Sequence, residues 1–276
     1  MAKPKLGLIP AAQGTKFYSV LPSDGTGDFD FTRGSVATRI NAQGLIENVA
    51  SGQSRLDYPM IDGVQKGCPH HILEPARTNL FSYSEDFNSG SPNWVLYGGA
   101  TVTSNNAISP DGTLNADKLS NQGGIYSQRV YNPNIDYVFS LFIKKNTATG
   151  LHMNFVDQSS GYLGGTIIYT YSSGAIQITQ SANSSVSAKS VDYGNGWIRL
   201  IMKFTTNVAQ NYNYQAIESI GGDSLIWGAM LEQGSYPTSY IPTNGQSGGV
   251  TRSAETANGA GNSTTFNSEE GVLMAE

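Results

Sequence analysis

Tyrosine side chains set in polar stretches are the residues of this chain best suited to ligand binding. An aromatic ring stacks on the apolar face of a sugar, while Asn, Gln and Asp side chains hydrogen-bond its hydroxyls. The 276 residues include 15 Tyr and 3 Trp. The tyrosines in polar or loop contexts are candidate glycan-binding residues: Tyr97, Tyr126, Tyr162, Tyr212 and Tyr214. The alternative role for such rings is to cover a sheet or to line a subunit interface.

Glycosidic hydrolysis would require two carboxyl groups that converge on the scissile bond. The candidates are Asp192, Glu218, Asp223 and Glu232. Asp223 lies in a Gly-Gly-Asp-Ser stretch of turn composition, and Glu232 follows a predicted strand, where capping and turn roles are common. We therefore predict no catalytic residue and no enzymatic activity, with a polysaccharide depolymerase as the enzymatic alternative.

Metal or nucleophile chemistry would depend on Cys68, His70, His71 and His152. The first three are close in sequence, but adjacent histidines point to opposite sides of an extended chain, and no further ligands are evident. Residues 24–30 bring oxygen ligands together without the spaced acidic array of an EF-hand. Zincin and Walker motifs are absent from the sequence. We predict no metal and no cofactor, and the single Cys excludes an internal disulfide.

Short runs of alternating apolar and polar residues, separated by Gly, Asn, Asp and Ser, fill residues 94–242. They predict strands over 137–144, 166–171, 175–179, 197–204 and 224–227, with hairpin signals at 171–174 and 193–196. In the run 197–204 one side carries Ile198, Leu200, Met202 and Phe204, while Arg199 and Lys203 take the other, which we expect to face water. This pattern is typical of an antiparallel sandwich.

The predicted fold class is therefore all-β: an extended N-terminal module followed by an antiparallel jelly-roll β-sandwich. We place the module at residues 1–80 and the sandwich at 81–242. Residues 243–276, rich in Gly, Asn, Ser and Thr, are expected to be a linker that leads into the start of a further β-domain. We expect Trp94, Trp197 and Trp227 to lie in the core.

The module lacks sustained periodicity, so we expect it to lean on the next domain or on a sister chain. Its arginines stand beside carboxylates in the sequence, and Arg–carboxylate pairs would hold the segment: Arg33, Arg39, Arg55 and Arg77 with Asp28, Asp30, Glu47, Asp57 and Glu74. As exposed pairs they would be worth about 0–1 kcal/mol each, enough to set register more than stability.

The charge balance excludes one class of partner. Sixteen Lys and Arg residues against 21 Asp and Glu residues give a net charge of −5, with only 13% charged residues. Such a surface cannot neutralise a phosphate backbone, so we predict no nucleic-acid partner. No apolar run has the length of a membrane span or of a signal-peptide core, so we expect synthesis in the cytoplasm without export, and no membrane partner.

Three blocks of the sequence are distinctive. The first comprises residues 29–41, 44–48 and 55–58, the second 67–80 and 83–87, and the third 227–243. Together they resemble the structural proteins of tailed bacteriophages, which occur as tail, neck or head-fibre components. In that family an extended N-terminal module precedes a carbohydrate-binding-like jelly roll. The resemblance covers about residues 15–243.

This resemblance implies a non-enzymatic virion protein, either a head-fibre subunit or a neck or tail decoration subunit. Its partners would be capsid, neck or tail proteins and further copies of itself, since a fibre is expected to be a homotrimer in which three chains bury one shared core. Longer relatives tend to continue into a second lectin-like sandwich, whose first strand residues 266–276 resemble. The alternatives are an adhesin that binds host surface glycans and, in the enzyme class, a depolymerase.

Overall fold

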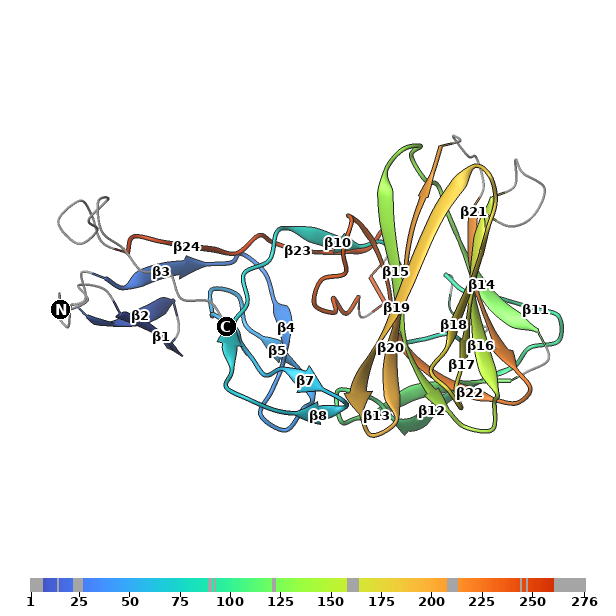
Figure 1. The fold of residues 1–276 in the computed structure, drawn as a ribbon, viewed down its shortest axis with the longest axis horizontal. Coiled ribbons are helices and arrows are strands. Elements are labelled where there is room, and N and C mark those ends of the chain that lie inside the picture. Colours follow the sequence, from blue (N-terminus) through green and yellow to red (C-terminus); the bar gives the residue numbers. More distant parts are fainter. Residues whose placement is uncertain are drawn as a thin grey trace.

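The computed structural model describes residues 7–13, 15–21, 27–88, 91, 93–120, 123–157, 164–207, 213–243, 245–246 and 248–260. Within these residues all regular structure is β-strand, and every strand pair is antiparallel. The predicted all-β class with a jelly-roll sandwich is confirmed. Figure 1 shows an elongated molecule with the sandwich at one end and the first strands at the other.

Two six-stranded sheets form the sandwich (Figure 1). We call one the open sheet; in spatial order it contains β11 (Val95–Tyr97), β14 (Gly124–Arg129), β21 (Asn213–Ile220), β16 (Gly150–Asp157), β17 (Gly165–Thr170) and β18 (Ile176–Gln180). The other, the covered sheet, contains β12 (Val102–Ile108), β13 (Leu114–Leu119), β22 (Ser224–Gln233), β15 (Asp136–Lys145), β20 (Trp197–Thr206) and β19 (Ser184–Gly194). All five predicted strands are present.

The main core lies between these sheets, where alternate residues of each strand meet. Leu151, Met153 and Phe155 of β16 face it from the open sheet, and Leu200 and Met202 of β20 face it from the covered sheet; all are fully buried. The predicted hairpins also form. At the β19–β20 turn, Asn195 and Gly196 both have positive φ, as the tight turns that match strand twist require.

A second apolar cluster covers the outer face of the covered sheet. It includes Phe142, Trp197, Trp227 and Tyr240, all almost fully buried, so the core assignment of these tryptophans is confirmed. The expectation that Arg199 faces water is wrong: it is 4% exposed and donates a 2.8 Å hydrogen bond to the Thr238 carbonyl. The chain after β22 and the β4–β5 hairpin lie over this face, which strand periodicity alone cannot reveal.

Short strands build the N-terminal module: β1 (Gly7–Gln13), β2 (Lys16–Leu21), β3 (Phe29–Thr32), β4 (Ala37–Ile40), β5 (Ile46–Val49), β6 (Leu56–Asp57), β7 (Met60–Ile61), β8 (Val64–Gln65), β9 (His70–His71) and β10 (Arg77–Asn79). They pair as β1–β2–β3, β4–β5, β6–β9 and β7–β8. Ile46 of β5 joins the second cluster. The module thus leans on its own sandwich, one of the two supports expected for it.

The chain beyond the sandwich returns to the module. β23 (Val250–Arg252) pairs with β10, and β24 (Thr256–Asn258) pairs with β3, so both run back along the N-terminal strands (Figure 1). The linker prediction is therefore wrong for these residues, because their hydrogen-bonding partners lie far away in the sequence. The strand predicted within residues 266–276 lies outside the described residues.

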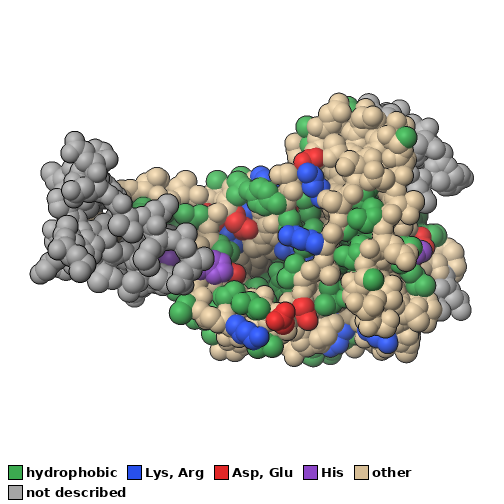
Figure 2. Space-filling view, viewed as in Figure 1, with side chains coloured by type: hydrophobic (Ala, Val, Ile, Leu, Met, Phe, Trp, Pro, Cys, Tyr) green, Lys and Arg blue, Asp and Glu red, His purple; other side chains and the backbone are tan. Residues whose placement is uncertain are grey.

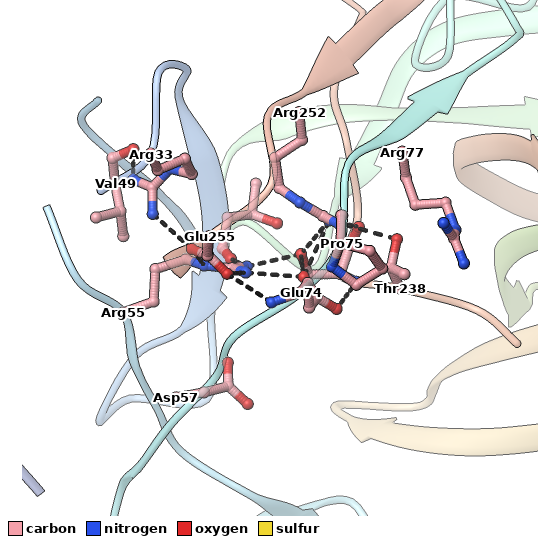
Figure 3. Close-up of polar contacts among 12 residues, drawn as sticks. Arg33, Val49, Arg55, Asp57, Glu74, Pro75, Arg77, Thr238, Arg252 and Glu255 are labelled. Atoms are coloured by element: carbon pink, nitrogen blue, oxygen red, sulfur yellow. Dashed lines mark hydrogen bonds and ion pairs between the residues drawn. The ribbon is translucent and has the colours of Figure 1, made fainter. Parts of the chain in front are cut away.

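Buried ion pairs join the N-terminal module to the chain that returns to it after the sandwich, at a junction shown in Figure 3. Glu255 accepts from Arg33 Nη1 and Arg55 Nε, each at 2.7 Å, and Glu74 accepts from Arg55 Nη2 at 2.8 Å and Arg252 Nη1 at 2.9 Å. The side chains of the three arginines and of Glu255 are fully buried. Burial by itself would raise the pKa of Glu74, but Arg252 and Arg55 hold this pKa below its usual value.

The expectation of exposed arginine pairs is wrong for Arg33 and Arg55, because their buried partner Glu255 comes from the returning chain. Arg39 does form the predicted partly exposed pair with Glu47, at 2.6 Å. A cleft of about 220 Å³ lies beside the network, between β4 and the covered sheet. Figure 2 shows basic and acidic side chains around this hollow. The module is thus joined to the sandwich through charged as well as apolar contacts.

Candidate functional site

The outer face of the open sheet carries the candidate site. Strand register places Tyr97 of β11 beside Gly124 of β14, Gly124 beside Glu218 of β21, and Glu218 beside His152 of β16. Their neighbours in the chain face the core: Ile125, Leu151 and Ile217 are all fully buried. Because side chains alternate along a strand, the row that contains Tyr97, Glu218 and His152 must point away from the core.

Gly124 allows this row to close. A Cβ atom at Gly124 would stand 2.5 Å from the Ile217 carbonyl oxygen, 2.7 Å from Glu218 Cγ and 2.8 Å from the Tyr97 hydroxyl oxygen. The missing side chain therefore lets the Tyr97 ring pass over β14 and reach the carboxylate on the next strand. Close approach, and not an unusual φ, is the reason for glycine here.

Glu218 is the centre of the polar contacts. Its Oε1 accepts hydrogen bonds from the Tyr97 hydroxyl and, at 3.2 Å, from Asn154 Nδ2, while His152 Nδ1 lies 3.4 Å from its Oε2. The His152 contact is the largest cause of a lowered Glu218 pKa; burial opposes it and the Tyr97 hydrogen bond adds to it. Burial, followed by the bond to Glu218, raises the pKa of Tyr97. The carboxylate is thus anionic at neutral pH.

A second row lies next to the first. Tyr126, Ala216, Asn154 and Thr166 are register neighbours across β14, β21, β16 and β17. The Tyr126 ring centroid lies 5.8 Å from that of Tyr97, with the ring planes tilted by 51°. The site therefore combines two partly exposed aromatic rings with a carboxylate, an imidazole and an amide, the side-chain types that bind sugars.

Two buried side-chain oxygens in this second row have no hydrogen-bond partner. They are Asn154 Oδ1 and Thr166 Oγ1, in side chains that are 6% and 8% exposed as whole residues. The orientation of the Asn154 amide follows from its bond to Glu218, which uses the Nδ2 group. An unsatisfied buried polar group costs about 1–3 kcal/mol.

Of the five predicted tyrosines, Tyr97 and Tyr126 lie together on the outer face of the open sheet. Tyr214 belongs to β21, where only its backbone pairing is described, and Tyr162 and Tyr212 lie outside the described residues. Sequence reasoning named Glu218 and His152 for other chemistry and missed Gly124, Asn154 and Thr166. Alternation along β16 would have put His152 and Asn154 on one face, but nothing local showed that β21 lies beside it.

The four carboxylates considered for hydrolysis are held by separate partners. Glu232 is buried in β22 and accepts from the Thr238 backbone and hydroxyl, Asp223 lies 3.7 Å from Lys118, and Asp192 accepts from its own hairpin. No two of the four share a hydrogen-bond or ion-pair partner among the described residues. Each of the four carboxylates is thus engaged by a different group.

The residues considered for metal chemistry lie on different elements. Cys68 is exposed before β9, which contains His70 and His71, whereas His152 belongs to the open sheet. Asp30 pairs with Lys16 at 3.8 Å, and part of the 24–30 stretch lies outside the described residues. Within the described residues, no three His, Cys, Asp or Glu side chains form a metal-binding group, and no helix is long and apolar enough to cross a membrane.

No family model matches the chain, and no curated protein matches it. Among solved structures, it is similar to the C-terminal family 22 carbohydrate-binding module of Clostridium thermocellum Xyn10B, with a TM-score of 0.37 and 16% identity over 58% of this chain and 98% of that one. It is also similar to a putative sugar-binding protein from Bacteroides thetaiotaomicron, with a TM-score of 0.35 and 13% identity over 56% of this chain and all of that one.

A third similar structure is the enzymatically active domain of bacteriophage CBA120 tailspike protein 4. The TM-score is 0.36 and the identity 15%, over 56% of this chain and 21% of that one, so the match spans about a fifth of the tailspike domain. All three TM-scores lie below 0.5. The fold and the candidate site therefore rest on the strand register and contacts of this chain.

Proposed function

We propose that the β-sandwich is a glycan-binding module whose site is the outer face of the open sheet. The observation that carries this proposal is the row in which Tyr97 crosses Gly124 to bind Glu218 beside Tyr126 and His152. The two rings offer stacking surfaces for sugar rings, and the carboxylate, imidazole and amide offer hydrogen bonds to hydroxyls. The biological ligand in this proposal is a glycan of the host surface.

Titration of the purified protein with oligosaccharides tests this proposal. We expect Tyr97→Ala and Tyr126→Ala each to weaken binding about tenfold or more, because each removes a stacking ring. Tyr236→Ala is the matched control, since Tyr236 is 49% exposed and lies against Arg77, away from the open sheet. Binding that survives both substitutions, or no binding to any glycan of a broad array, would reject the proposed site.

We also propose that the protein binds glycans without cleaving them. Glycoside hydrolysis uses one carboxyl group as an acid, which requires a raised pKa. Glu218 has the opposite tendency, and no second carboxylate joins it among the described residues. Incubation with a bound polysaccharide should release no reducing ends; release that Glu218→Gln abolishes would contradict this proposal.

The wider role we propose is that of a structural subunit of a phage virion, in a head fibre or as a neck or tail decoration. The resemblance of the three sequence blocks supports it. So does the elongated shape, in which buried ion pairs join a module to a sandwich that projects from it (Figures 1 and 3). The module would contact capsid, neck or tail proteins, and three chains would form the subunit.

Light scattering after size-exclusion chromatography tests the oligomer, and imaging of the particle tests the location. We expect a stable trimer and density for the sandwich outside the capsid, neck or tail. A monodisperse monomer at micromolar concentration, without affinity for other virion proteins, would contradict the structural role but leave the glycan site untouched.

A further inference from the structure

Two hydrogen-bond donors of the candidate site already bind a carboxylate within the protein. The Tyr97 hydroxyl and Asn154 Nδ2 both donate to Glu218 Oε1, and His152 Nδ1 faces Glu218 Oε2. The outer lone pairs of the Glu218 carboxylate, whose side chain is 32% exposed, remain for a ligand, and Asn154 Oδ1 is a buried acceptor without a hydrogen-bond partner. The ligand must therefore bring donors.

The charge of this face points the same way. Residues that face outward on the described strands of the open sheet include Glu218 but no Lys or Arg. His152 is the one basic group among them, and it already contacts the carboxylate. A negatively charged sugar would find no free cation here and would meet the Glu218 charge at short range, where like charges repel.

A protonated amine satisfies these features together. An ammonium group brings three donors and no acceptor, carries the charge opposite to Glu218, and is attracted to the faces of aromatic rings such as Tyr97 and Tyr126. A neutral sugar offers hydroxyl donors without the charge. An N-acetylated sugar replaces the amine by an amide, which has a single N–H donor and no charge.

We propose that this face selects glycans with free amino groups, such as oligomers of hexosamine without N-acetyl groups, and rejects glycans rich in uronic acid. The inference rests on the proposed glycan-binding function and narrows its ligand class. In the bound state the ammonium would sit against the Glu218 carboxylate, beside the tyrosine rings.

Three oligosaccharides of equal length provide the test: a glucosamine oligomer, its N-acetylated form and a galacturonic acid oligomer. We expect the glucosamine oligomer to bind about tenfold more tightly than the acetylated one, the effect of one charge-assisted hydrogen bond. The galacturonic acid oligomer should not bind measurably. The preference should shrink in high salt and disappear above the pKa of the sugar amine, which tests the idea in the unmodified protein.

Glu218→Gln should abolish the preference for the amine and retain weak binding of the acetylated oligomer. Asp223→Asn is the matched control, because it removes one partly exposed carboxylate that pairs with Lys118, at the same cost in net charge. Equal affinity for the amine and the acetylated oligomer would overturn this inference, and so would an unchanged ratio of the two affinities in the Gln variant. The proposed glycan-binding function would still stand if binding of either oligomer depends on the tyrosines. Failure of all glycans to bind would overturn both.

Discussion

The two outer faces of the sandwich contain similar residue types, which are buried on one face and partly exposed on the other. On the covered sheet, Phe142, Trp227 and Arg199 lie beneath the chain after β22, and Arg199 donates to the Thr238 carbonyl and the Ser140 hydroxyl. On the open sheet, Tyr97 and Glu218 contact each other and remain partly exposed. Aromatic and charged residues thus serve packing on one face and ligand recognition, as we propose, on the other.

This contrast shows that residue type does not reveal function in a β-sandwich. Both faces follow the same period of two, and both combine rings with charged groups. The difference comes from the segments packed on each sheet: the module and the chain after β22 cover the outer face of one sheet, whereas Tyr97 and Glu218 on the other are partly exposed.

Removal of one partner from the buried ion pairs between the module and the returning chain should lower the stability of the protein. Glu255→Ala would leave Arg33 buried without a carboxylate and Arg55 with Glu74 alone, which should cost about 3–5 kcal/mol in the free energy of unfolding. Urea denaturation measures this loss. The control is Glu47→Ala, which removes the carboxylate of the partly exposed Arg39 pair and should cost about 0–1 kcal/mol. Equal losses would show that burial of the junction does not matter.

Truncation of an aromatic ring beneath the cover should cost more than truncation on the open face. Phe142→Ala leaves a cavity at a fully buried position, and we expect a loss of about 3 kcal/mol. Ile168→Ala changes a partly exposed outward residue of β17 and should cost about 1 kcal/mol. Thermal unfolding of both variants measures the difference, and a larger effect at Ile168 would reverse our assignment of the faces.

Asp117 should make the sandwich less stable as pH rises. Its carboxylate is 1% exposed and accepts from the backbone N–H groups of Phe87 and Asn105, and burial raises its pKa to about 6. Since this folded-state pKa exceeds the unfolded value, the folded state binds more protons between about pH 4 and 6, and stability falls across that window.

The expected size of this pH effect is on the order of 2 kcal/mol. The measurement is the midpoint of urea unfolding from pH 4 to 7, corrected with Asp117→Asn, which cannot titrate. Carboxylates with lowered pKa, such as Glu74 and Glu218, act in the opposite sense at lower pH. An identical pH profile in the Asn variant would contradict the role of Asp117.

Gly124→Ala should separate the Tyr97 ring from Glu218 while the cover remains in place. The new Cβ would collide with the Ile217 carbonyl and the Tyr97 hydroxyl, at a cost of about 1–2 kcal/mol in stability. Gly150→Ala is the matched control, because its Cβ would stand 2.6 Å from the Tyr169 carbonyl in the same sheet. Only the Gly124 variant should also lose glycan affinity, as measured by titration.

Local patterns predicted much of the sandwich. The run 197–204, the hairpin at 193–196 and the burial of Trp227 followed from alternation and turn chemistry, because these depend on neighbours in the chain. The same reasoning failed for Arg199, because exposure of its side depends on a segment after β22. It also failed for β24, whose strand character comes from pairing with β3.

The candidate site shows the same division. Tyr97 and Tyr126 were found because polar contexts favour exposed rings, and Glu218 and His152 were noticed for unrelated chemistry. Their meeting depends on the order of strands in the open sheet, in which β14 lies between β11 and β21. Gly124 acquires its role only in that order, because its missing side chain matters only when a ring must cross it.

The amino-acid sequence by itself determined the all-β class, the main strands and turns of the sandwich and the candidate tyrosines, because each depends on periodicity or conformational preference within a few residues. Only the tertiary structure decided which sheet stays open and which carboxylate neutralises Arg33. That partner, Glu255, lies 222 residues away along the chain. Contacts across such separations arise from the packing of the whole chain, and no local pattern encodes them.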